Sequence, residues 1–449
     1  MGQYLATPVT AKESGKGEND QLKYGMSSMQ GWRVCMVRTA ASNPVSGLNS
    51  FFQNPVRSTC LGPFPRTHAR TCILNIVQED AHIVKLDLGD PHATGLFAVF
   101  DGHGGKLVAK YAAKHLARAL NDTDHFDKRD GDLGLAFAQA FYKIDEELDT
   151  PAGMQELREL AGVGARTQDQ TLFGDVGLQG IDLDADDDEY SGNDTRNADD
   201  TADDRGDKLE HHSSSREFVQ SALARDSVIR RDEDPDTRDA DADSDDFAEH
   251  KASGMGCTAV AAMVRNGEVT VANTGDSRCV ISRNGVAEPL TLDHKPVLLE
   301  EAERIMNAGG FVRDNRVNGA LNVSRTLGDL DFKRNTNLPH THQMVVATPD
   351  ITAFELQKGD EFVILACDGI WDVLSNQEAV DFVRKRIKAG QCLQEICEEM
   401  CDHCLAPNLQ GLCRGADNMS VIIVLFKGTA GDLLRGGLAG LVVKLFGCR

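Results

Sequence analysis

The chain has little positive charge and no long hydrophobic run. Its 449 residues contain 47 Lys and Arg against 70 Asp and Glu, which gives a formal net charge of −23. A protein that coats nucleic acid needs clustered basic side chains to neutralise phosphates, so we expect no direct binding to nucleic acid. The acidic balance points instead to basic partners or to carboxylates that bind metal. Residues Leu433–Arg449 are apolar but too short to span a bilayer, so no transmembrane segment is predicted.

The sequence also lacks a signal peptide and a disulfide framework. The first residues contain no basic region followed by a long apolar run. Twelve cysteines are scattered without a repeating spacing, which is typical of a reduced intracellular chain. Cys401 and Cys404 flank His403, but no second pair stands at zinc-site spacing, so a buried thiol pair on a helix is favoured over a metal site. We expect a monomer in the cytoplasm, the nucleus or both.

One feature qualifies the absence of membrane attachment. The opening MGQYLATP offers Gly2 for N-myristoylation, although Ala6 stands where Ser or Thr is preferred. A single acyl chain gives only weak, reversible attachment, so membrane association is expected to be weak at most.

The apolar residues that are present, 41% of the chain, suffice for a sizeable core. Short β-rich runs bounded by Gly, Asn or Asp predict strands at 96–100, 258–264, 269–273, 279–282, 362–366 and 419–426. Apolar residues at three- and four-residue spacing predict helices at 106–120, 133–148, 300–308, 376–389 and 392–404. Because strands cluster on both sides of helices without a βαβ alternation, we predict a layered α+β fold.

Two segments interrupt this pattern. Residues 163–253, and above all 181–246, are dominated by Asp and contain too few large apolar residues to offset the entropy of ordering. They are interpreted as a disordered acidic insertion, which serves either as a solvated spacer or as a docking arm for basic proteins such as histones. Residues 37–78 are rich in Pro, Ser, Asn and Arg, carry few acids and resemble neither flank.

Four aspartates stand at the ends of apolar runs within two residues of a glycine: Asp101, Asp276, Asp368 and Asp417. Any one of them is well explained as a turn residue. Four in one chain favour a shared, oxygen-rich site, and hard ions such as Mg²⁺ or Mn²⁺ prefer such ligands. One carboxylate can bridge two ions, and a water between them loses a proton near neutral pH and becomes a nucleophile.

Ten short motifs occur in an order that resembles the type 2C metal-dependent protein phosphatases, the PPM family. They are MQGWR (29–33), EDAH (79–82), FAVFDGHGG (97–105), GCTAV (256–260), ANTGDSR (272–278), LTLDHKP (290–296), AGGFV (308–312), LNVSRTLGD (321–329), ACDGIWDV (366–373) and GADNMS (415–420). The N-terminus and the acidic insertion are most similar to the gamma subgroup. The resemblance implies a four-layer α-β-β-α sandwich of two antiparallel sheets flanked by helices.

The resemblance also implies a metal site. Asp101 would bridge two Mg²⁺ or Mn²⁺ ions, the Gly102 carbonyl would help to hold one of them, and Asp368 and Asp417 would complete the pair. Asp276 and Asp372 match the positions that, with Asp368, hold a weaker third ion.

Four further residues receive roles by resemblance. Glu79 and Asp80 would orient metal-bound waters, Arg33 would hold the substrate phosphate through its guanidinium fork, and His103 would protonate the departing Ser or Thr oxygen. The implied reaction is hydrolysis of phosphoserine and phosphothreonine in proteins by a metal-bridged hydroxide that attacks phosphorus in line. The alternative is a catalytically weak, phosphatase-like protein that binds basic partners through its acidic insertion; a different two-metal phosphoesterase would lack the motif order.

The sequence departs from the family at residues 37–78. Joining Met36 directly to Glu79 restores a continuous family motif, so we expect the 42 residues to split a single strand of the active-site sheet. Val codons begin with GT and Gln can be encoded by CAG, so we hypothesise a translated, unspliced intron; the competing interpretation is a genuine loop. If neither holds, Arg33 would be displaced and activity impaired. The expected organisation is one phosphatase domain over 1–428, interrupted at 37–78 and 163–253, with a tail at 429–449.

Overall fold

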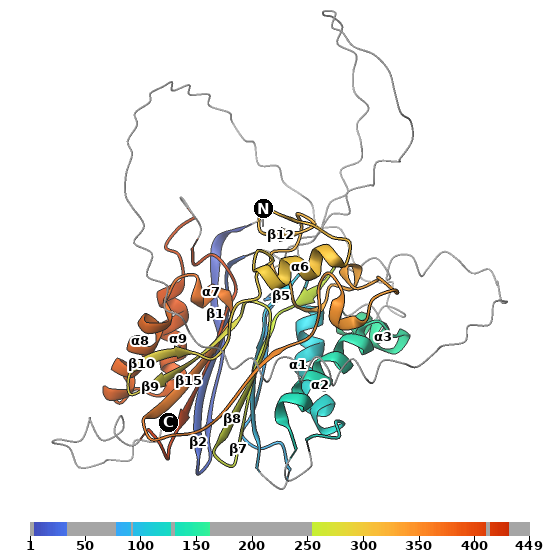
Figure 1. Cartoon of the computed structure of the whole chain (residues 1–449). Helices are drawn as coiled ribbons and strands as arrows, with labels where there is room; N and C mark the ends of the chain where they lie inside the picture. The colour runs from blue at the N-terminus through green and yellow to red at the C-terminus, as the bar shows by residue number, and fades with distance from the viewer. Residues whose placement is uncertain are drawn as a thin grey trace, which may run out of the picture.

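The computed structural model describes residues 4–33, 78–90, 93–126, 131–161, 254–409 and 414–430. Two antiparallel sheets pack face to face, and helices cover the outer side of each (Figure 1). The proposed acidic insertion, the tail beyond Ala430 and all of the 37–78 segment except Gln78 lie outside the described residues.

The first sheet has six strands in the order β1-β2-β16-β15-β9-β10. Their bounds are β1 Tyr4–Glu18, β2 Leu22–Arg33, β9 Arg278–Arg283, β10 Val286–Pro289, β15 Asp360–Ala366 and β16 Met419–Phe426. Every neighbouring pair is antiparallel. Residues from both ends of the described chain therefore lie side by side, because β2 pairs with β16 from Leu22↔Phe426 to Met29↔Met419.

The second sheet has five strands in the order β14-β8-β7-β4-β3, again antiparallel throughout. Their bounds are β3 Ala81–Lys85, β4 Gly95–Phe100, β7 Ala259–Arg265, β8 Glu268–Thr274 and β14 Asp350–Glu355. Strand β4 is buried on both faces. Phe97 and Val99 point into the core between the sheets, whereas Leu96, Ala98 and Phe100 pack under the helices, as the two-residue period of a strand requires.

Smaller elements lie at one end of the sandwich. A three-stranded sheet joins β5 Gly102–His103, β6 Gly256–Cys257 and β13 Leu327–Gly328, and a hairpin joins β11 Val312–Arg313 to β12 Arg316–Val317. Two short 3-10 helices, η1 Leu330–Phe332 and η2 His340–His342, follow.

The helices divide between the two outer faces. Helices α1 Leu107–Asn121 and α2 Leu133–Leu148 pack on the five-stranded sheet, with α3 Pro151–Leu160 against them. Helices α8 Asn376–Lys388 and α9 Leu393–Cys404 cover the six-stranded sheet, and α7 Asp368–Trp371 follows β15. Helix α6 Leu299–Asn307 lies beside the small sheets (Figure 1).

The capping of two helices follows directly from the sequence. Asp132 accepts hydrogen bonds from the backbone N–H groups of Gly134 and Leu135 at the start of α2. Ser375 and Glu378 form a reciprocal capping box at the start of α8.

The α+β sandwich expected from the sequence is confirmed, and each of the eleven predicted strands and helices is present within about two residues of its predicted ends. Cys401 and Cys404 are buried on α9, as the thiol-pair interpretation expects. Within the described residues, none of the helices has the length and hydrophobicity needed to cross a bilayer.

One expectation about the 37–78 segment is wrong. Arg33 ends β2 in the six-stranded sheet, whereas Ala81 begins β3 in the five-stranded sheet. The two flanks are therefore strands of different sheets and not halves of one strand, because β2 pairs with β1 and β16 while β3 pairs with β4.

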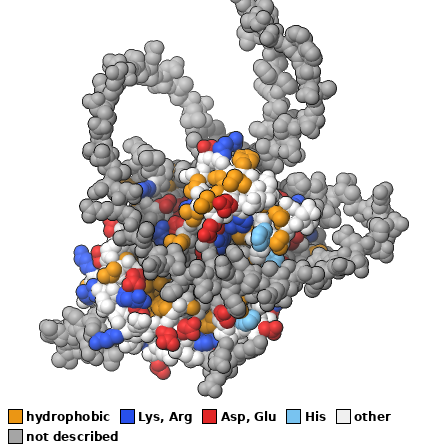
Figure 2. Space-filling model, in the orientation of Figure 1, with side chains coloured by type: hydrophobic (Ala, Val, Ile, Leu, Met, Phe, Trp, Pro, Cys, Tyr) orange, Lys and Arg blue, Asp and Glu red, His pale blue; other side chains and the backbone are white. Residues whose placement is uncertain are grey.

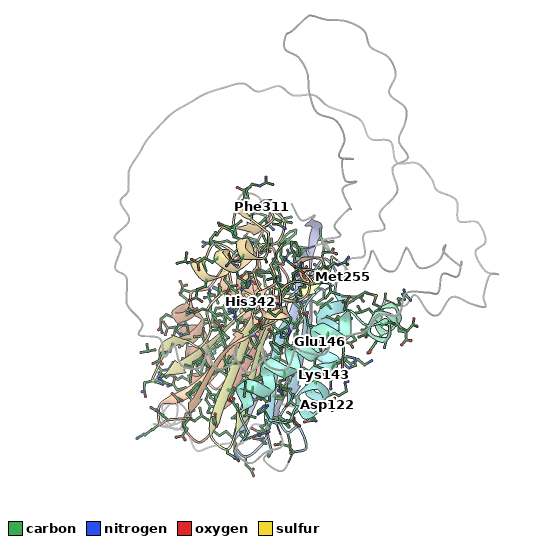
Figure 3. The ribbon with its side chains drawn as sticks, turned by 45° about the vertical axis from the view of Figure 1, so that its right-hand side comes forward. Asp122, Lys143, Glu146, Met255, Phe311 and His342 are labelled. Carbon is green, nitrogen blue, oxygen red and sulfur yellow. The ribbon has the colours of Figure 1, made fainter. Side chains whose placement is uncertain are left out.

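Exposed apolar side chains gather around α6 on the surface of the described residues. Leu298, Leu299, Met306 and Phe311 are large exposed hydrophobic residues in and around α6. Figure 2 shows hydrophobic side chains gathered where Figure 1 places this helix, and Figure 3 places Phe311 near the upper end of the described part of the molecule.

Helices α1 and α2 are joined by a polar contact. Lys143 of α2 donates to Asp122 at 2.6 Å and ties α2 to the end of α1 (Figure 3).

Candidate metal centre

Buried strands deliver the predicted carboxylates to one end of the sandwich. Asp101 follows β4 of the five-stranded sheet, and Asp80 directly precedes β3, its neighbour. In the six-stranded sheet, Asp368 follows β15 and Asp417 directly precedes β16. Because both strand pairs are antiparallel, each places the end of one strand beside the start of the next. The two sheets thus contribute two carboxylates each.

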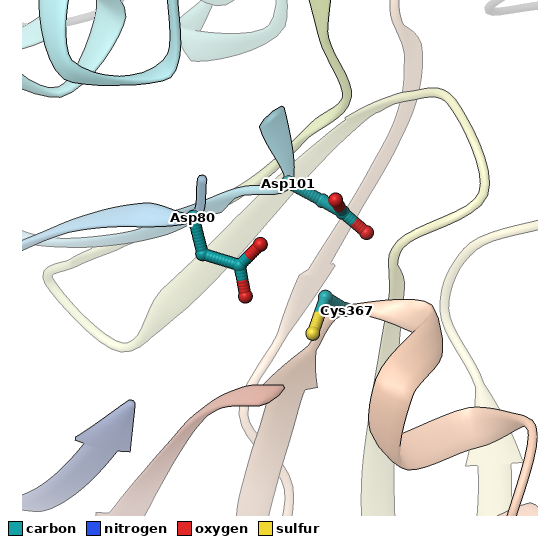
Figure 4. Close-up of side chains that lie close together, drawn as sticks. All are labelled: Asp80, Asp101 and Cys367. Atoms are coloured by element: carbon teal, nitrogen blue, oxygen red, sulfur yellow. The ribbon is translucent and has the colours of Figure 1, made fainter. Parts of the chain in front are cut away.

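The close approach of these groups is clearest around Asp101. One ligand atom each from Asp80, Asp101 and Cys367 lies within 4.8 Å of the other two. Figure 4 shows both carboxylates and the thiol directed into the space between the strand ends. The Cys367 backbone N–H and Sγ also tie β15 to β16, since Sγ accepts from the Ser420 N–H at 3.1 Å.

The electrostatics of the cluster call for cations. Burial, followed by repulsion from Asp368, raises the pKa of Asp101 well above its ordinary value. Burial and the charge of Asp417 do the same to the pKa of Asp368. Burial is also the main reason that the pKa of Asp80 rises to about 7, with a hydrogen bond from Ser420 opposing it. Acids packed this closely in a buried site cannot all ionise unless a positive charge joins them.

An unsatisfied oxygen supports the same conclusion. Oδ1 of Asp368 is buried and has no hydrogen-bond partner among the described residues. Such an atom is destabilising unless a ligand completes its coordination. With carboxylate oxygens in the majority, the donor set suits Mg²⁺ or Mn²⁺.

Gly102 lies where only glycine fits. A Cβ on this residue would stand 2.3 Å from the carbonyl oxygen of Glu79. The backbone of β5 therefore approaches the loop before β3 closely, next to Asp101.

The loop that carries Glu79 and Asp80 is fixed to the six-stranded sheet. Ser420 of β16 donates to Asp80 Oδ2 at 2.7 Å, and Gln78 donates to Ser28 of β2 at 2.9 Å. The Glu79 N–H donates to Asn418 Oδ1 at 3.4 Å. Although 42 residues separate them from Met36, these acids are held against β2 and β16.

Arg33 also reaches the site. Its guanidinium donates to Asp417 Oδ1. Burial alone would lower the pKa of Arg33, but the charges of Asp417 and Asp101 raise it above its ordinary value. The displacement of Arg33 considered from the sequence is therefore not observed.

Asp276 and Asp372 lie together beside Asp368. Asp276 follows β8 and is buried, and Lys295 forms an ion pair with it. Burial raises the pKa of Asp372, Lys295 lowers it and Asp276 raises it again, so the three charges interact. Asp276 and Asp372 both also raise the pKa of Asp368.

His103 makes a contact that the sequence did not reveal. Its Nε2 lies 2.5 Å from Oδ2 of the buried Asp329. Burial alone would lower the pKa of His103, but the Asp329 carboxylate raises it. Burial alone would raise the pKa of Asp329, but the charge of His103 and the hydrogen bond with it lower that pKa below its ordinary value.

Sequence reasoning missed four residues at the site: Lys295, Asp329, Cys367 and Asn418. Each stands inside a motif already recognised as part of the family pattern, namely LTLDHKP, LNVSRTLGD, ACDGIWDV and GADNMS. The motifs thus pointed to the right segments of the chain. Within each motif, however, nothing in the sequence distinguished the site residue from its neighbours.

Known proteins share both the sequence and the fold. The family model for protein phosphatase 2C matches residues 71–166 and 183–411. A probable protein phosphatase 2C of rice (Oryza sativa subsp. japonica) is 38% identical over 428 residues, which cover 95% of this chain and 90% of the relative. Protein phosphatase 1G of Mus musculus is 31% identical over 552 aligned residues, covering 95% and 93%.

A solved structure agrees on the fold alone. The serine-threonine phosphatase 2C of Toxoplasma gondii covers 94% of this chain and 98% of its own, at a TM-score of 0.51 and 16% identity. With the family model and the curated relatives, the conclusion is direct: the chain belongs to the protein phosphatase 2C family. Its class is that of the metal-dependent protein serine/threonine phosphatases.

Proposed function

We propose that this site hydrolyses phosphoserine and phosphothreonine in proteins, with Asp101, Asp368 and Asp417 holding two Mg²⁺ or Mn²⁺ ions. The observation that carries the proposal is the gathering of carboxylates at one end of the sandwich, where Asp101 lies close to Asp80, Oδ1 of Asp368 has no hydrogen-bond partner among the described residues, and Arg33 is fixed by Asp417. Bound ions would supply a water of lowered pKa for in-line attack on phosphorus and would neutralise phosphate charge.

The chain's own residues have the following proposed roles. The Gly102 carbonyl helps to hold one ion, Glu79 and Asp80 orient water near the ions, and Asp276 and Asp372 join Asp368 around a weaker third ion. Arg33 is supported as the phosphate-binding group because its guanidinium stands beside Asp417 and can offer further donors to phosphate oxygens. His103 gives a proton to the departing Ser or Thr oxygen.

A Mn²⁺-dependent assay on a phosphothreonine peptide tests the proposal, with Asp101→Asn as the inactive control. We expect turnover by the full chain, abolished by EDTA and reduced at least ~100-fold in the variant, as for loss of a principal electrostatic contributor. If the purified chain lacked metal-dependent turnover but still bound basic proteins, the competing function, a phosphatase-like binding protein, would replace it.

The organisation of the chain is also proposed as one phosphatase domain over 1–428 with a tail at 429–449, of the gamma subgroup. We infer that Val37–Gln78 is a translated, unspliced intron. Sequencing of mature transcripts tests this: messages lacking these codons are expected, and their complete absence would favour a genuine loop. A variant without Val37–Gln78 should retain metal-dependent turnover.

The remaining proposals concern partners and location. We propose that residues 163–253 bind basic proteins such as histones, which a pull-down with and without this segment would test at varied salt. The protein is expected to act as a monomer in the cytoplasm or nucleus, with Gly2 myristoylation adding weak membrane association; mass spectrometry of the N-terminal peptide tests the modification.

A further inference from the structure

The small sheet β5-β6-β13 brings two distant motifs together. His103 pairs with Gly256, and Gly256 pairs on its other side with Gly328. The His103 ring and the Asp329 carboxylate meet over Gly256: a Cβ there would lie 2.2 Å from Asp329 Oδ2 and 2.7 Å from His103 Nε2. The absence of a side chain at Gly256 therefore creates the space in which they touch.

Asp329 is held in place from several sides. It is 1% exposed, and its backbone N–H donates to the Met255 carbonyl at 2.8 Å. Its φ of 51° and ψ of 40° are left-handed, a conformation that aspartate adopts more readily than most non-glycine residues and that aims its side chain at His103. The preceding Gly328 N–H is fixed in turn by Asp145 at 2.8 Å.

The contact determines which ring nitrogen of His103 remains available to a substrate. An ionised carboxylate only accepts hydrogen bonds, so Asp329 requires a proton on His103 Nε2. Among the described residues no side chain or backbone group bonds to the other ring nitrogen, Nδ1, and the side chain is 19% exposed. Nδ1 is the nitrogen left for a substrate.

We propose that Asp329 is the positioning residue of His103, holding the ring through Nε2 so that Nδ1 delivers the proton to the leaving group. The inference rests on the proposed function. In the step, the attacking hydroxide bonds to phosphorus while the P–Oγ bond breaks. The electron pair of the broken P–Oγ bond goes to Oγ. The Nδ1 proton of the imidazolium moves to Oγ. The ring that remains is a neutral imidazole, and its Nε2–H still donates to the Asp329 carboxylate.

Leaving-group dependence tests this role. A serine or threonine alkoxide needs the proton, whereas p-nitrophenolate departs without it. We expect Asp329→Asn to lower kcat on a phosphothreonine peptide by ~100-fold and kcat on p-nitrophenyl phosphate by less than about threefold, since general acids contribute roughly 10²–10⁴-fold. The concentration of Mn²⁺ for half-maximal rate should stay unchanged. Asp331→Asn, an exposed aspartate two residues away, is the matched control.

The double variant separates positioning from folding. If Asp329 acts through His103, adding Asp329→Asn to His103→Gln should cause no further loss on the peptide. Equal losses on both substrates, or additive losses in the double variant, would overturn the proposal. If His103→Gln itself showed no difference between substrates, the proposed role of His103 would fail; absence of metal-dependent turnover in the unmodified chain would instead refute the proposed function.

A measurement on the unmodified protein avoids dependence on variant folding. Proton NMR should show a strongly deshielded imidazole N–H from the 2.5 Å contact, absent in His103→Gln. Its absence from the unmodified protein would contradict the proposal. Gly256→Ala, which inserts a methyl group between the two side chains, should reproduce the substrate difference of Asp329→Asn, whereas Gly254→Ala, with no atom within 4 Å of the added Cβ, should not.

Discussion

At the scale of single residues, the site holds several buried carboxylates close to one guanidinium, that of Arg33. Arg33 reaches the acids from the last position of β2, and Asp417 is its partner. A phosphate that binds at this place would share the guanidinium with Asp417. The fork of donors on arginine permits this sharing, whereas the single ammonium of lysine has no planar pair of donors.

We expect Arg33→Ala to raise KM for a phosphothreonine peptide by roughly tenfold to a hundredfold, because a charge-assisted hydrogen bond contributes about 1.5–3 kcal/mol. Arg33→Lys should give a KM between that of the unmodified protein and that of Arg33→Ala. Steady-state kinetics at saturating Mn²⁺ measure the effect. Arg313→Ala, which removes an exposed arginine, is the control and should leave KM unchanged.

A second prediction concerns Glu301 of α6, which is 2% exposed and accepts from Arg325 at 2.6 Å and from Arg304 at 2.8 Å. Burial alone would raise the pKa of Glu301, but Arg325 and Arg304 hold it well below the ordinary value. Glu301→Gln should lower the free energy of unfolding by about 3 kcal/mol, since it removes the buried carboxylate that Arg304 and Arg325 share, while Arg325 keeps its ion pair with Asp350. Urea denaturation checks this, and Glu303→Gln, an exposed position on the same helix, should change it little.

The residues differ in how readily the sequence revealed them. Asp101 and Asp368 each follow an apolar strand and precede glycine, so local pattern made them candidates for a shared site, and the family motifs supplied their expected roles. Cys367 and Asp329 have no such local mark. Their importance comes from what lies opposite them in space, Asp80 for the thiol and His103 for the carboxylate, and contacts between residues so far apart in the chain are not encoded in adjacent residues.

At the scale of elements, strands of large apolar residues were predicted well and strands of small residues were missed. β2 reads LKYGMSSMQGWR and yet is buried along most of its length. Its Gly25 lies against the start of α9, where a larger side chain would not fit. The long β1 is polar and was also missed, because its order comes from pairing with β2 and not from an apolar face of its own.

The contact between β2 and α9 gives the element-scale prediction. A Cβ at Gly25 would lie 2.2 Å from the backbone carbon of Leu393, at the start of α9. Gly25→Ala should therefore push the helix outward and lower the free energy of unfolding by about 1–3 kcal/mol. Thermal unfolding followed by circular dichroism measures it. An unchanged melting temperature would contradict so close an approach of the two elements; Gly428→Ala, in open space, is the control.

At the scale of the whole molecule, the candidate site lies where two sheets meet, and the ions proposed for it would link its occupancy to the stability of the fold. The layered class of the fold could be predicted because strand and helix periodicities are local. The position of the site could not, because it depends on which ends of β4 and β15 come together across the sandwich.

The linkage predicts how metal-free stability depends on pH. The pKa of Asp80 rises from 3.8 to about 7, and those of Asp101 and Asp368 also rise. Between these values the folded state binds more protons than the unfolded state, so stability in EDTA should fall as pH rises from about 4 to 7. Excess Mn²⁺ stabilises the ionised form, by about 2.7 kcal/mol at a hundredfold excess over Kd. The difference in melting temperature between Mn²⁺ and EDTA should therefore grow from pH 5 to 8.

Scanning fluorimetry across this range checks the prediction. Asp101→Asn should reduce the Mn²⁺-dependent increment at every pH. A melting temperature that is insensitive to metal throughout would show that these carboxylates bind no divalent ion.

The separation of β2 and β3 into different sheets has a consequence for how the gene can vary. A connection between sheets is under no register constraint, so extra length there costs chiefly loop-closure entropy, about 0.6 kcal/mol for each doubling. The 42 codons of residues 37–78 also keep the reading frame. A splicing error at this junction would thus yield a chain that still folds, and natural selection would have little protein-level penalty with which to remove it.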